Sequence, residues 1–209
     1  MKIALFTLLL LLIFLGGAVA QNEPVTSRLY FPGLIGIGIP SGDDQTSMQS
    51  GFSLNTAVEY RPIYADAVFF RFNYDNISSH YNNLAQPIPT NINHGKLSAN
   101  FFLLGAGYRQ KIDRLGVYFV AQPGYSNSVY DLVYSNASGF ALSNTNSDHF
   151  SAKATMGVEY YIVPHFALVL EPSYYHIFKT SRGFVLNPNY VCYSVGFTTT
   201  LFQLQGPHN

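Results

Sequence analysis

The stretch 157-GVEYYIVPHFALVLEPSYY-175 contains the unit from which the fold can be predicted. On either side of Val163-Pro164-His165, apolar and polar residues alternate with a period of two, which is typical of β-strands that have one apolar face. The apolar face carries Val158, Tyr160, Leu168, Leu170 and Tyr174. The stretch therefore predicts a tight hairpin of two strands, each with an apolar and a polar side.

The same unit recurs along the chain. Alternation predicts eight strands, at 29–39, 52–60, 68–75, 96–110, 117–125, 150–160, 168–175 and 191–198. Short turns at Arg61-Pro62-Ile63-Tyr64, Lys111-Ile112-Asp113-Arg114 and Val163-Pro164-His165 alternate with long polar connections at 40–50, 76–95, 127–148 and 180–188. Outer-membrane barrels have short periplasmic turns and longer outer loops. The sequence therefore predicts an all-β fold, an eight-stranded antiparallel up-and-down transmembrane β-barrel with both termini in the periplasm.

Composition favours a membrane setting. Only 11% of the residues are charged, and the chain has 16 Tyr and 17 Phe but no Trp. Few charges and many tyrosines suit a wall that faces lipid, with Tyr at the interfaces. Closure is expected because hydrocarbon offers no partner for the N–H and C=O groups of an open sheet edge. The absence of Trp also removes the G-x-W start of a soluble lipocalin-type barrel.

The facing of each strand follows from the alternation, with the apolar set outward and small or polar residues inward. In the fourth strand this rule places Leu97, Ala99 and Phe101 outward, although the middle of that strand, 101–104, is apolar on both faces. Pro123 and Pro172 each remove a ladder donor, so a bulge or a loosened ladder is expected beside them. The sequence 136–139 (Asn-Ala-Ser-Gly) predicts a turn that extends a hairpin above the membrane.

The first twenty residues predict a cleaved export signal. Met1-Lys2 is a basic start, residues 3–15 are apolar, and Ala18-Val19-Ala20 is a cleavage site before Gln21. We therefore expect a signal peptide at 1–20 and a single barrel domain at 21–209.

Several functional classes have no support in the sequence. The formal net charge is zero, so nothing favours a nucleic-acid partner. Cys192 is the only cysteine, which excludes an intramolecular disulfide. No metal-ligand cluster, phosphate-binding glycine loop or nucleophile elbow occurs, so no cofactor, metal or catalytic residue is expected.

Five inward charges form the candidate site, a lumen charge network of Glu59, Arg71, Lys153, Glu159 and Glu171. Charges inside a narrow barrel must pair, because an isolated buried charge costs several kcal/mol. Counting from the turn at 163–165 places Glu159 level with Val169 and Glu171 one inward position further on. Both carboxylates should then reach one cation, for which Arg71 and Lys153 are the candidates. A plug of paired charges is favoured over an ion path, because eight strands leave room only for side chains.

A hydrolase is a weaker alternative. Asp148-His149, at a strand end, with Asp43-Asp44 in the first outer loop, is similar to the catalytic groups of outer-membrane aspartyl-type proteases. Those barrels are larger, and solvated loop charges explain the pattern more simply.

Three segments carry a family resemblance. The hairpin 157–175, with its G-x-E-Y strand and inward Glu, resembles the penultimate hairpin of small bacterial outer-membrane barrels, and 103-LLGAGYRQKIDRLGVYFVAQPGYS-126 resembles their middle hairpin. The closing 194-SVGFTTTLF-202 is similar to their C-terminal assembly signal, although Thr199 stands where an apolar residue is usual. The nearest family is the outer membrane protein β-barrel domain of the PorT-like type, common in Bacteroidetes. This resemblance implies a link to secretion or envelope assembly.

The function expected from the sequence is non-enzymatic. An integral protein of the cell outer membrane with a filled lumen would act structurally, or through a protein or surface ligand at its outer loops. Its other partner is the outer-membrane lipid. A narrow pore or transporter is the alternative.

Overall fold

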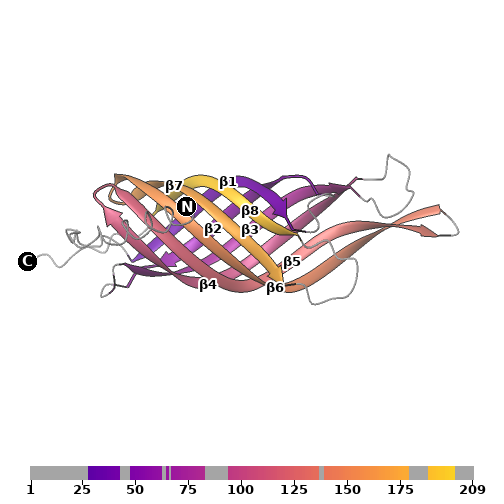
Figure 1. The fold of residues 1–209 in the computed structure, drawn as a ribbon, viewed down its shortest axis with the longest axis horizontal. Coiled ribbons are helices and arrows are strands. Elements are labelled where there is room, and N and C mark those ends of the chain that lie inside the picture. Colours follow the sequence, from indigo (N-terminus) through magenta and orange to yellow (C-terminus); the bar gives the residue numbers. More distant parts are fainter. Residues whose placement is uncertain are drawn as a thin grey trace, which may run out of the picture.

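The computed structural model describes residues 28–42, 48–62, 65, 67–82, 94–136, 139–178 and 188–200. The predicted export signal, residues 201–209 and the pair Asp43-Asp44 lie outside this part of the chain. The described residues form eight antiparallel strands that close into one barrel in chain order (Figure 1). The strands are β1 (Leu29–Ser41), β2 (Gly51–Tyr60), β3 (Val68–Asn82), β4 (His94–Ile112), β5 (Leu115–Asn136), β6 (Gly139–Val163), β7 (Phe166–Phe178) and β8 (Asn189–Thr199). The predicted eight-stranded up-and-down barrel is confirmed.

The wall of the barrel follows the alternation of the sequence. On β2, Phe52, Leu54 and Val58 are exposed outside, whereas Asn55 and Glu59 are buried inside. The predicted facing is confirmed on β1 to β3 and on β5 to β8, and every strand exposes large apolar side chains on its outer face. An apolar surface of this extent, continuous around the barrel, fits hydrocarbon rather than water. In the described part of the chain, no helix is long and apolar enough to cross a membrane.

Strand β4 corrects one prediction. Leu97, Ala99 and Phe101 point inward and are fully buried, whereas Phe102 and Leu104 lie on the outer wall. The first half of β4 lies beyond the apolar band, where the outside is polar and the inside is filled with apolar side chains. The usual relation between polarity and facing is therefore reversed there.

The register sets the tilt of the strands. A row of cross-strand partners starts at Tyr60, and it passes through Phe70, Ala106, Ala121, Ala154, Tyr174 and Val191 to Ile39 on β1. Tyr60 itself is paired with Leu29 on β1, so one circuit shifts the register by ten residues. Eight strands with such a stagger tilt by roughly 35–45° and enclose a space just wide enough for side chains.

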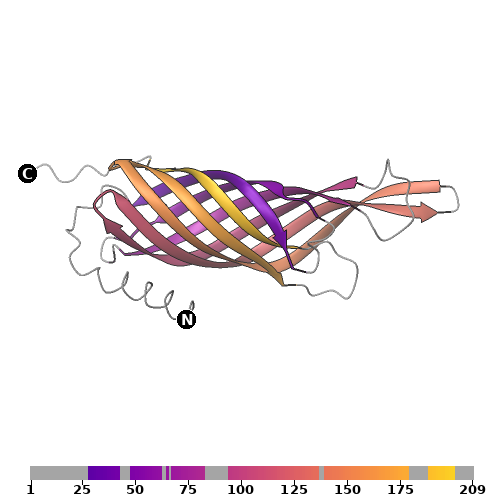
Figure 2. The same cartoon turned by 45° about the horizontal axis from the view of Figure 1, so that its top comes forward.

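The two ends of the barrel differ. At the turn end, β4–β5 and β6–β7 are joined by Asp113-Arg114 and Pro164-His165. At the opposite loop end, β5 and β6 continue as a two-stranded ribbon beyond the other strands (Figures 1 and 2). Asn136 pairs with Gly139 at its tip, as the predicted turn requires. The predicted connections at 76–95 and 127–148 are shorter than expected, because the neighbouring strands extend into them.

Each of the two central prolines interrupts one ladder. Pro123 pairs with Ala152 on β6, and Pro172 pairs with Tyr193 on β8. On the other side of each proline, towards β4 for Pro123 and towards β6 for Pro172, the pairing is interrupted. The register is the same before and after each gap. The missing proline N–H therefore loosens the ladder as expected, but no bulge forms there.

Candidate functional site: the lumen charge network

Eight charged side chains meet inside the barrel. Each is at most 7% exposed, and four are cations and four carboxylates. They are Glu59 and Arg61 from β2 and its turn, Arg71 and Asp75 from β3, Arg109 from β4, Lys153 and Glu159 from β6, and Glu171 from β7. The structure brings all five residues of the candidate site together. Arg61, Asp75 and Arg109 are further members that were not predicted from the sequence.

Three guanidinium groups surround the carboxylate of Glu59. Arg61 Nε and Arg109 Nη2 lie 2.6 and 2.7 Å from Glu59 Oε1. Arg71 approaches the other oxygen with two nitrogens, Nη2 at 2.9 Å and Nε at 3.1 Å. Both nitrogens donate to the same oxygen, and the contact follows from the register, because Glu59 and Arg71 are direct cross-strand partners.

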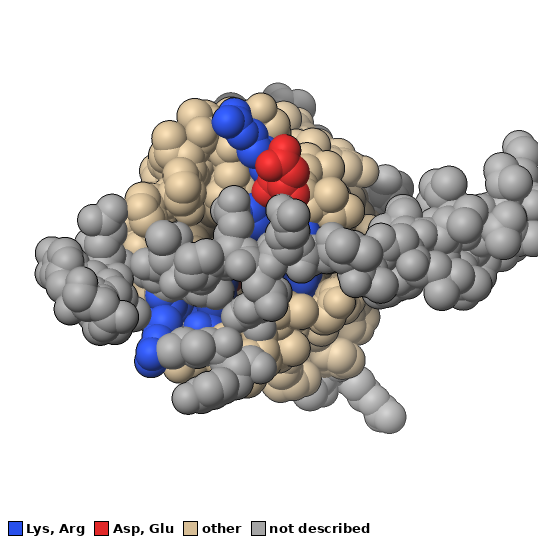
Figure 3. All heavy atoms as spheres, turned by 90° about the vertical axis from the view of Figure 1, so that its left-hand side faces the viewer, with Lys and Arg blue, Asp and Glu red and all other residues tan. Residues whose placement is uncertain are grey.

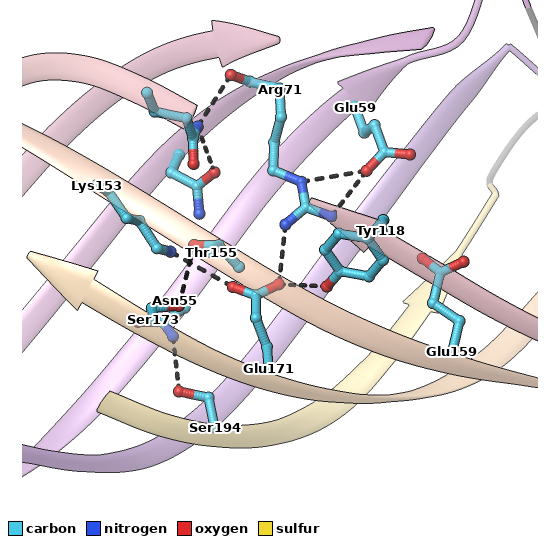
Figure 4. A network of polar contacts seen from close by, with 12 residues as sticks. Asn55, Glu59, Arg71, Tyr118, Lys153, Thr155, Glu159, Glu171, Ser173 and Ser194 are labelled. Atoms are coloured by element: carbon cyan, nitrogen blue, oxygen red, sulfur yellow. Dashed lines mark hydrogen bonds and ion pairs between the residues drawn. The ribbon is translucent and has the colours of Figure 1, made fainter. Parts of the chain in front are cut away.

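Glu171 joins the two sides of the network. Its Oε2 accepts hydrogen bonds from Arg71 Nη1, at 2.9 Å, and from the Tyr118 hydroxyl, and its Oε1 lies 3.5 Å from Lys153 Nζ (Figure 4). Lys153 Nζ also donates to Asp75 Oδ2 at 2.9 Å. The same oxygen accepts a hydrogen bond from the Tyr175 hydroxyl at 2.9 Å. Both predicted partners of Glu171 are therefore in contact with it.

Glu159 does not share those cations, so this part of the prediction is wrong. It is level with Val169, as counted from the turn, but Arg109 Nη2 is its main partner at 3.0 Å. Arg61 Nη2 lies further away, at 3.8 Å, and the Tyr161 hydroxyl donates to Glu159 Oε2 at 2.7 Å. The arginines nearer the turn end take the place of Arg71 and Lys153.

Aromatic rings hold the guanidinium groups in place. The Arg71 guanidinium carbon lies 5.3 Å from the ring centre of Phe69 and 4.8 Å from that of Tyr118, and Arg109 contacts the same two rings at 5.0 and 5.6 Å. The face of Tyr30 lies 3.3 Å from Arg61. These cation–π contacts add attraction and fill the space that water would otherwise occupy.

Neutral polar groups continue the network towards the loop end. The Gln122 side chain donates to Arg71 O at 3.1 Å and to Asn73 Oδ1 at 2.9 Å. Asn55 donates to Ser194 Oγ at 2.9 Å. Several strands are thus cross-linked through uncharged hydrogen bonds as well as through ion pairs.

An apolar layer lies between the charges and the loop end. It consists of Met48, Ile77, Tyr81, Leu97, Ala99, Phe101, Leu103, Tyr130, Tyr175, Ile177, Tyr190 and Cys192, all buried. The inward residues of the first half of β4 supply four of its members, which explains why their facing is reversed. The lumen is therefore charged near the turn end and apolar near the loop end.

Basic side chains also surround the turn end. Arg28, Arg61, Arg109, Lys111 and Arg114 lie there, and Figure 3 shows Lys and Arg at several places on this face. Lys111 Nζ lies 4.9 Å from the ring centre of Tyr161. Arg61 and Arg109 belong to the lumen charge network; beyond them Arg28, Lys111 and Arg114 stand against the one carboxylate of Asp113 in the β4–β5 turn, so these described residues carry a net positive charge.

The Asp148-His149 pair is not assembled as a catalytic couple. Being adjacent on a strand, the two side chains face opposite ways: His149 is buried, with Nε2 2.6 Å from Ser147 Oγ, and Asp148 is exposed. Hydrogen bonds from Tyr125 and Asn127 lower the pKa of Asp148. In the described residues, no group of three or more His, Cys, Asp or Glu side chains could hold a metal ion.

Comparisons with known proteins agree with this architecture. Residues 6–199 match the family model described as outer membrane protein beta-barrel domain. Neisserial surface protein A (NspA) has a similar structure, with a TM-score of 0.59 and 19% identity over 83% of this chain and 97% of that one. OprG of Pseudomonas aeruginosa gives a TM-score of 0.54 and 13% identity over 86% and 98%. Ail of Yersinia pestis, solved with the heparin analogue sucrose octasulfate, gives 0.50 and 10% over 82% and 96%.

These likenesses show the fold, and the family model shows the relationship. A comparison with curated proteins finds no match. The match to the family model covers all eight strands, and each of them exposes apolar side chains on the outer wall. The chain belongs to the outer membrane protein β-barrel domain family and is a protein of the bacterial outer membrane.

Proposed function

We propose that this protein is a closed, non-conducting barrel that acts at the cell surface through its loop end, without catalysis. The observation that carries the proposal is the filling of the lumen. Four cations and four carboxylates neutralise one another there, and an apolar layer follows them towards the loop end. An ion path would need hydrated charges along its length, and neither layer offers them.

We infer that the turn end and both termini face the periplasm. The support is the predicted export signal at 1–20 and the concentration of long strand extensions at the other end. In this orientation the β5–β6 ribbon stands above the outer leaflet. A thiol introduced by Asn144→Cys should react with a membrane-impermeant maleimide on intact cells, whereas Arg114→Cys should not. The reverse labelling pattern would overturn the orientation.

The partner at the loop end belongs to the same proposal. The likeness of the hairpins 103–126 and 157–175 to PorT-like barrels supports a role in secretion or envelope assembly. The ribbon is the described surface best placed for such a partner, because it projects beyond the rest of the barrel (Figure 2). Cross-linking in native membranes through a photoreactive residue at position 144, with position 114 as control, tests this role.

Single-channel recording tests the closed lumen. The wild type should give no steady conductance in planar bilayers, and Glu171→Gln should lower the unfolding midpoint in detergent without opening a channel. The reason is that Glu171→Gln leaves Arg71 and Lys153 with one carboxylate fewer. Asp131→Asn, the same chemical change on the exposed ribbon, is the matched control and should alter neither property. A steady conductance in Glu171→Gln at unchanged stability would establish a gated pore instead.

A further inference from the structure

One edge of the β5–β6 ribbon has no described strand beside it. The last pair between β6 and β7 on the side of the loop end is Phe150–Phe178, whereas β6 extends further, to Gly139. Among the described residues, 139–146 of β6 therefore pair with β5 alone. Figures 1 and 2 both show this part of the ribbon beyond the end of β7. The edge has the length of an ordinary strand.

The direction of the backbone groups on this edge follows from a proline. Pro172 is an outward residue of β7, and it interrupts the pairing with β6 rather than that with β8. Outward residues of β6 and β7 are therefore the ones that exchange backbone hydrogen bonds across this ladder. Asn144 and Asn146 are exposed on the same outward face of β6. Their N–H and C=O groups, like those at positions 140 and 142, consequently point to the side on which no described strand lies.

Nothing in the sequence protects this edge. Residues 139–146 read Gly-Phe-Ala-Leu-Ser-Asn-Thr-Asn, without a proline or a charged residue. The register between β5 and β6 is unshifted from Leu115–Tyr160 to Asn136–Gly139, so no bulge turns the edge away. Natural sheets usually protect an exposed edge by one of these means, because its backbone can pair with another chain. Their absence points to the addition of a strand, in which main-chain hydrogen bonds supply the affinity.

The charges of the ribbon favour a basic partner. From residue 115 to residue 152 the chain has two carboxylates, Asp131 and Asp148, and no Lys or Arg. Both are exposed on the outward face, where Asp148 lies on β6 itself and Asp131 is the partner of Asn144. A strand added beside β6 would place its outward side chains near both carboxylates. Opposite charges on neighbouring strands attract, so cations on the added strand would stabilise the pairing.

A second copy of this chain fits the edge less well. Its ribbon would bring two more carboxylates and no cation, and like charges on neighbouring strands repel. Two barrels inserted the same way into one membrane also have β6 strands that run in the same direction. The antiparallel pairing that continues this sheet would therefore not form between them.

We propose that residues 140–146 of β6 bind an extended, basic segment of a protein partner as an added antiparallel strand. The backbone groups at 140, 142, 144 and 146 would hold the segment. Asp131 and Asp148 would select cations four residues apart, because the outward positions beside Asn144 and Asp148 have that separation. The inference rests on the surface role proposed above, since it names the kind of partner that the loop end would bind.

Amide hydrogen exchange, measured by nuclear magnetic resonance on the full mature chain in lipid nanodiscs, tests this binding mode. The probe is the acetylated and amidated peptide TKTVTKTVT, whose residue types favour a strand and whose two lysines lie on one face. Its addition should protect the amides of residues 140, 142, 144 and 146. The amides of 141, 143 and 145 should be protected equally with and without the peptide, because they are directed towards β5.

Two variants at one position separate the backbone from the side chain. Asn144→Pro removes an edge N–H without removing a hydrogen bond to β5, so it should weaken peptide binding about tenfold. Asn144→Thr, the matched control, keeps the N–H and should bind as the wild type does. Both variants should keep the unfolding midpoint of the wild type, which shows that the barrel is folded. A peptide with Glu in place of both lysines should bind about fivefold more weakly at low salt.

Several outcomes would overturn the proposal. They are a lack of protection by the peptide, equal gains at even and odd positions, and equal binding by Asn144→Pro and Asn144→Thr. Protection of the edge without peptide, increasing with the number of barrels in each disc, would assign it to a second copy instead. None of these measurements depends on the orientation in the cell or on conductance. Failure of the thiol labelling or of the closed-lumen test would therefore leave the strand-binding result intact, and the reverse holds as well.

Discussion

At the scale of single residues, the lumen depends on glycines that make room for rings. Gly157 faces inward on β6 beneath the Tyr118 ring, and a methyl group added at Gly157 would overlap that ring. Tyr118 in turn donates a hydrogen bond to Glu171. Because Gly157 has no side chain, the Tyr118 ring of β5 can lie above it and reach Glu171 of β7.

Gly157→Ala should consequently destabilise the barrel by about 1–3 kcal/mol, the usual cost of overpacking. Denaturant unfolding from lipid vesicles measures the change. Gly33→Ala is the matched control, because its added carbon would meet only Phe197 Cζ at an ordinary 3.9 Å. Equal costs for the two substitutions would show that Tyr118 can move without loss.

The depth of a residue on the outer wall sets its tolerance of charge. Leu170 is 56% exposed in the middle of β7, whereas Ile112 is 64% exposed at the turn end of β4. Leu170→Arg should disfavour insertion by about 2–4 kcal/mol and Ile112→Arg by only about 0–1 kcal/mol. Folding titrations into vesicles give both values, and similar penalties would mean that the apolar band is placed wrongly.

At the scale of elements, the β5–β6 ribbon is separate from the barrel core. In the described ladder, residues 132–136 pair only with residues 139–143. Replacing 132–143 with Asn-Gly, which favours a two-residue hairpin turn, should change the unfolding free energy by less than about 1 kcal/mol. Asp131 and Asn144 then flank the new turn. A large loss of stability would show that the ribbon supports the barrel.

Strand β4 shows what the sequence could and could not predict. Alternation predicted the existence of all eight strands and the facing of seven, because their outer faces meet hydrocarbon. On β4 an apolar residue can face either lipid or the apolar layer, so polarity alone does not determine its orientation. Arg109 lies an even number of residues from Leu97, so it shares the inward face that the predicted facing of β4 did not identify.

A charge count could have recovered part of the missing site. The five predicted residues include three carboxylates but only two cations, which leaves one carboxylate unpaired in a closed lumen. Arg109 and Arg61, both near the turn end, were the available cations. Which carboxylate each of them contacts depends on the register around the whole barrel, and no local pattern contains that information.

At the scale of the whole molecule, closure should make the protein resistant to extraction and to detergent. The mature protein should remain in the membrane pellet after carbonate washing, and should migrate faster on a denaturing gel when unheated than when boiled. The reason is that all eight strands expose apolar side chains outward and pair on both edges. Release into the soluble fraction would contradict the membrane assignment.

The joint between β1 and β8 has a consequence for how the chain reaches its final state. The eleven paired positions from Phe31–Thr199 to Ser41–Asn189 include no charged residue, whereas all eight network charges belong to β2, to the turn after it, and to β3, β4, β6 and β7. All the charges of the network therefore lie between β2 and β7, so they can pair with one another before β1 and β8 meet. The pairing of β1 with β8, which closes the barrel, then brings no charged side chain into the lipid. Pulsed hydrogen exchange during refolding should find the amides of β1 and β8 protected after those of β3 and β6.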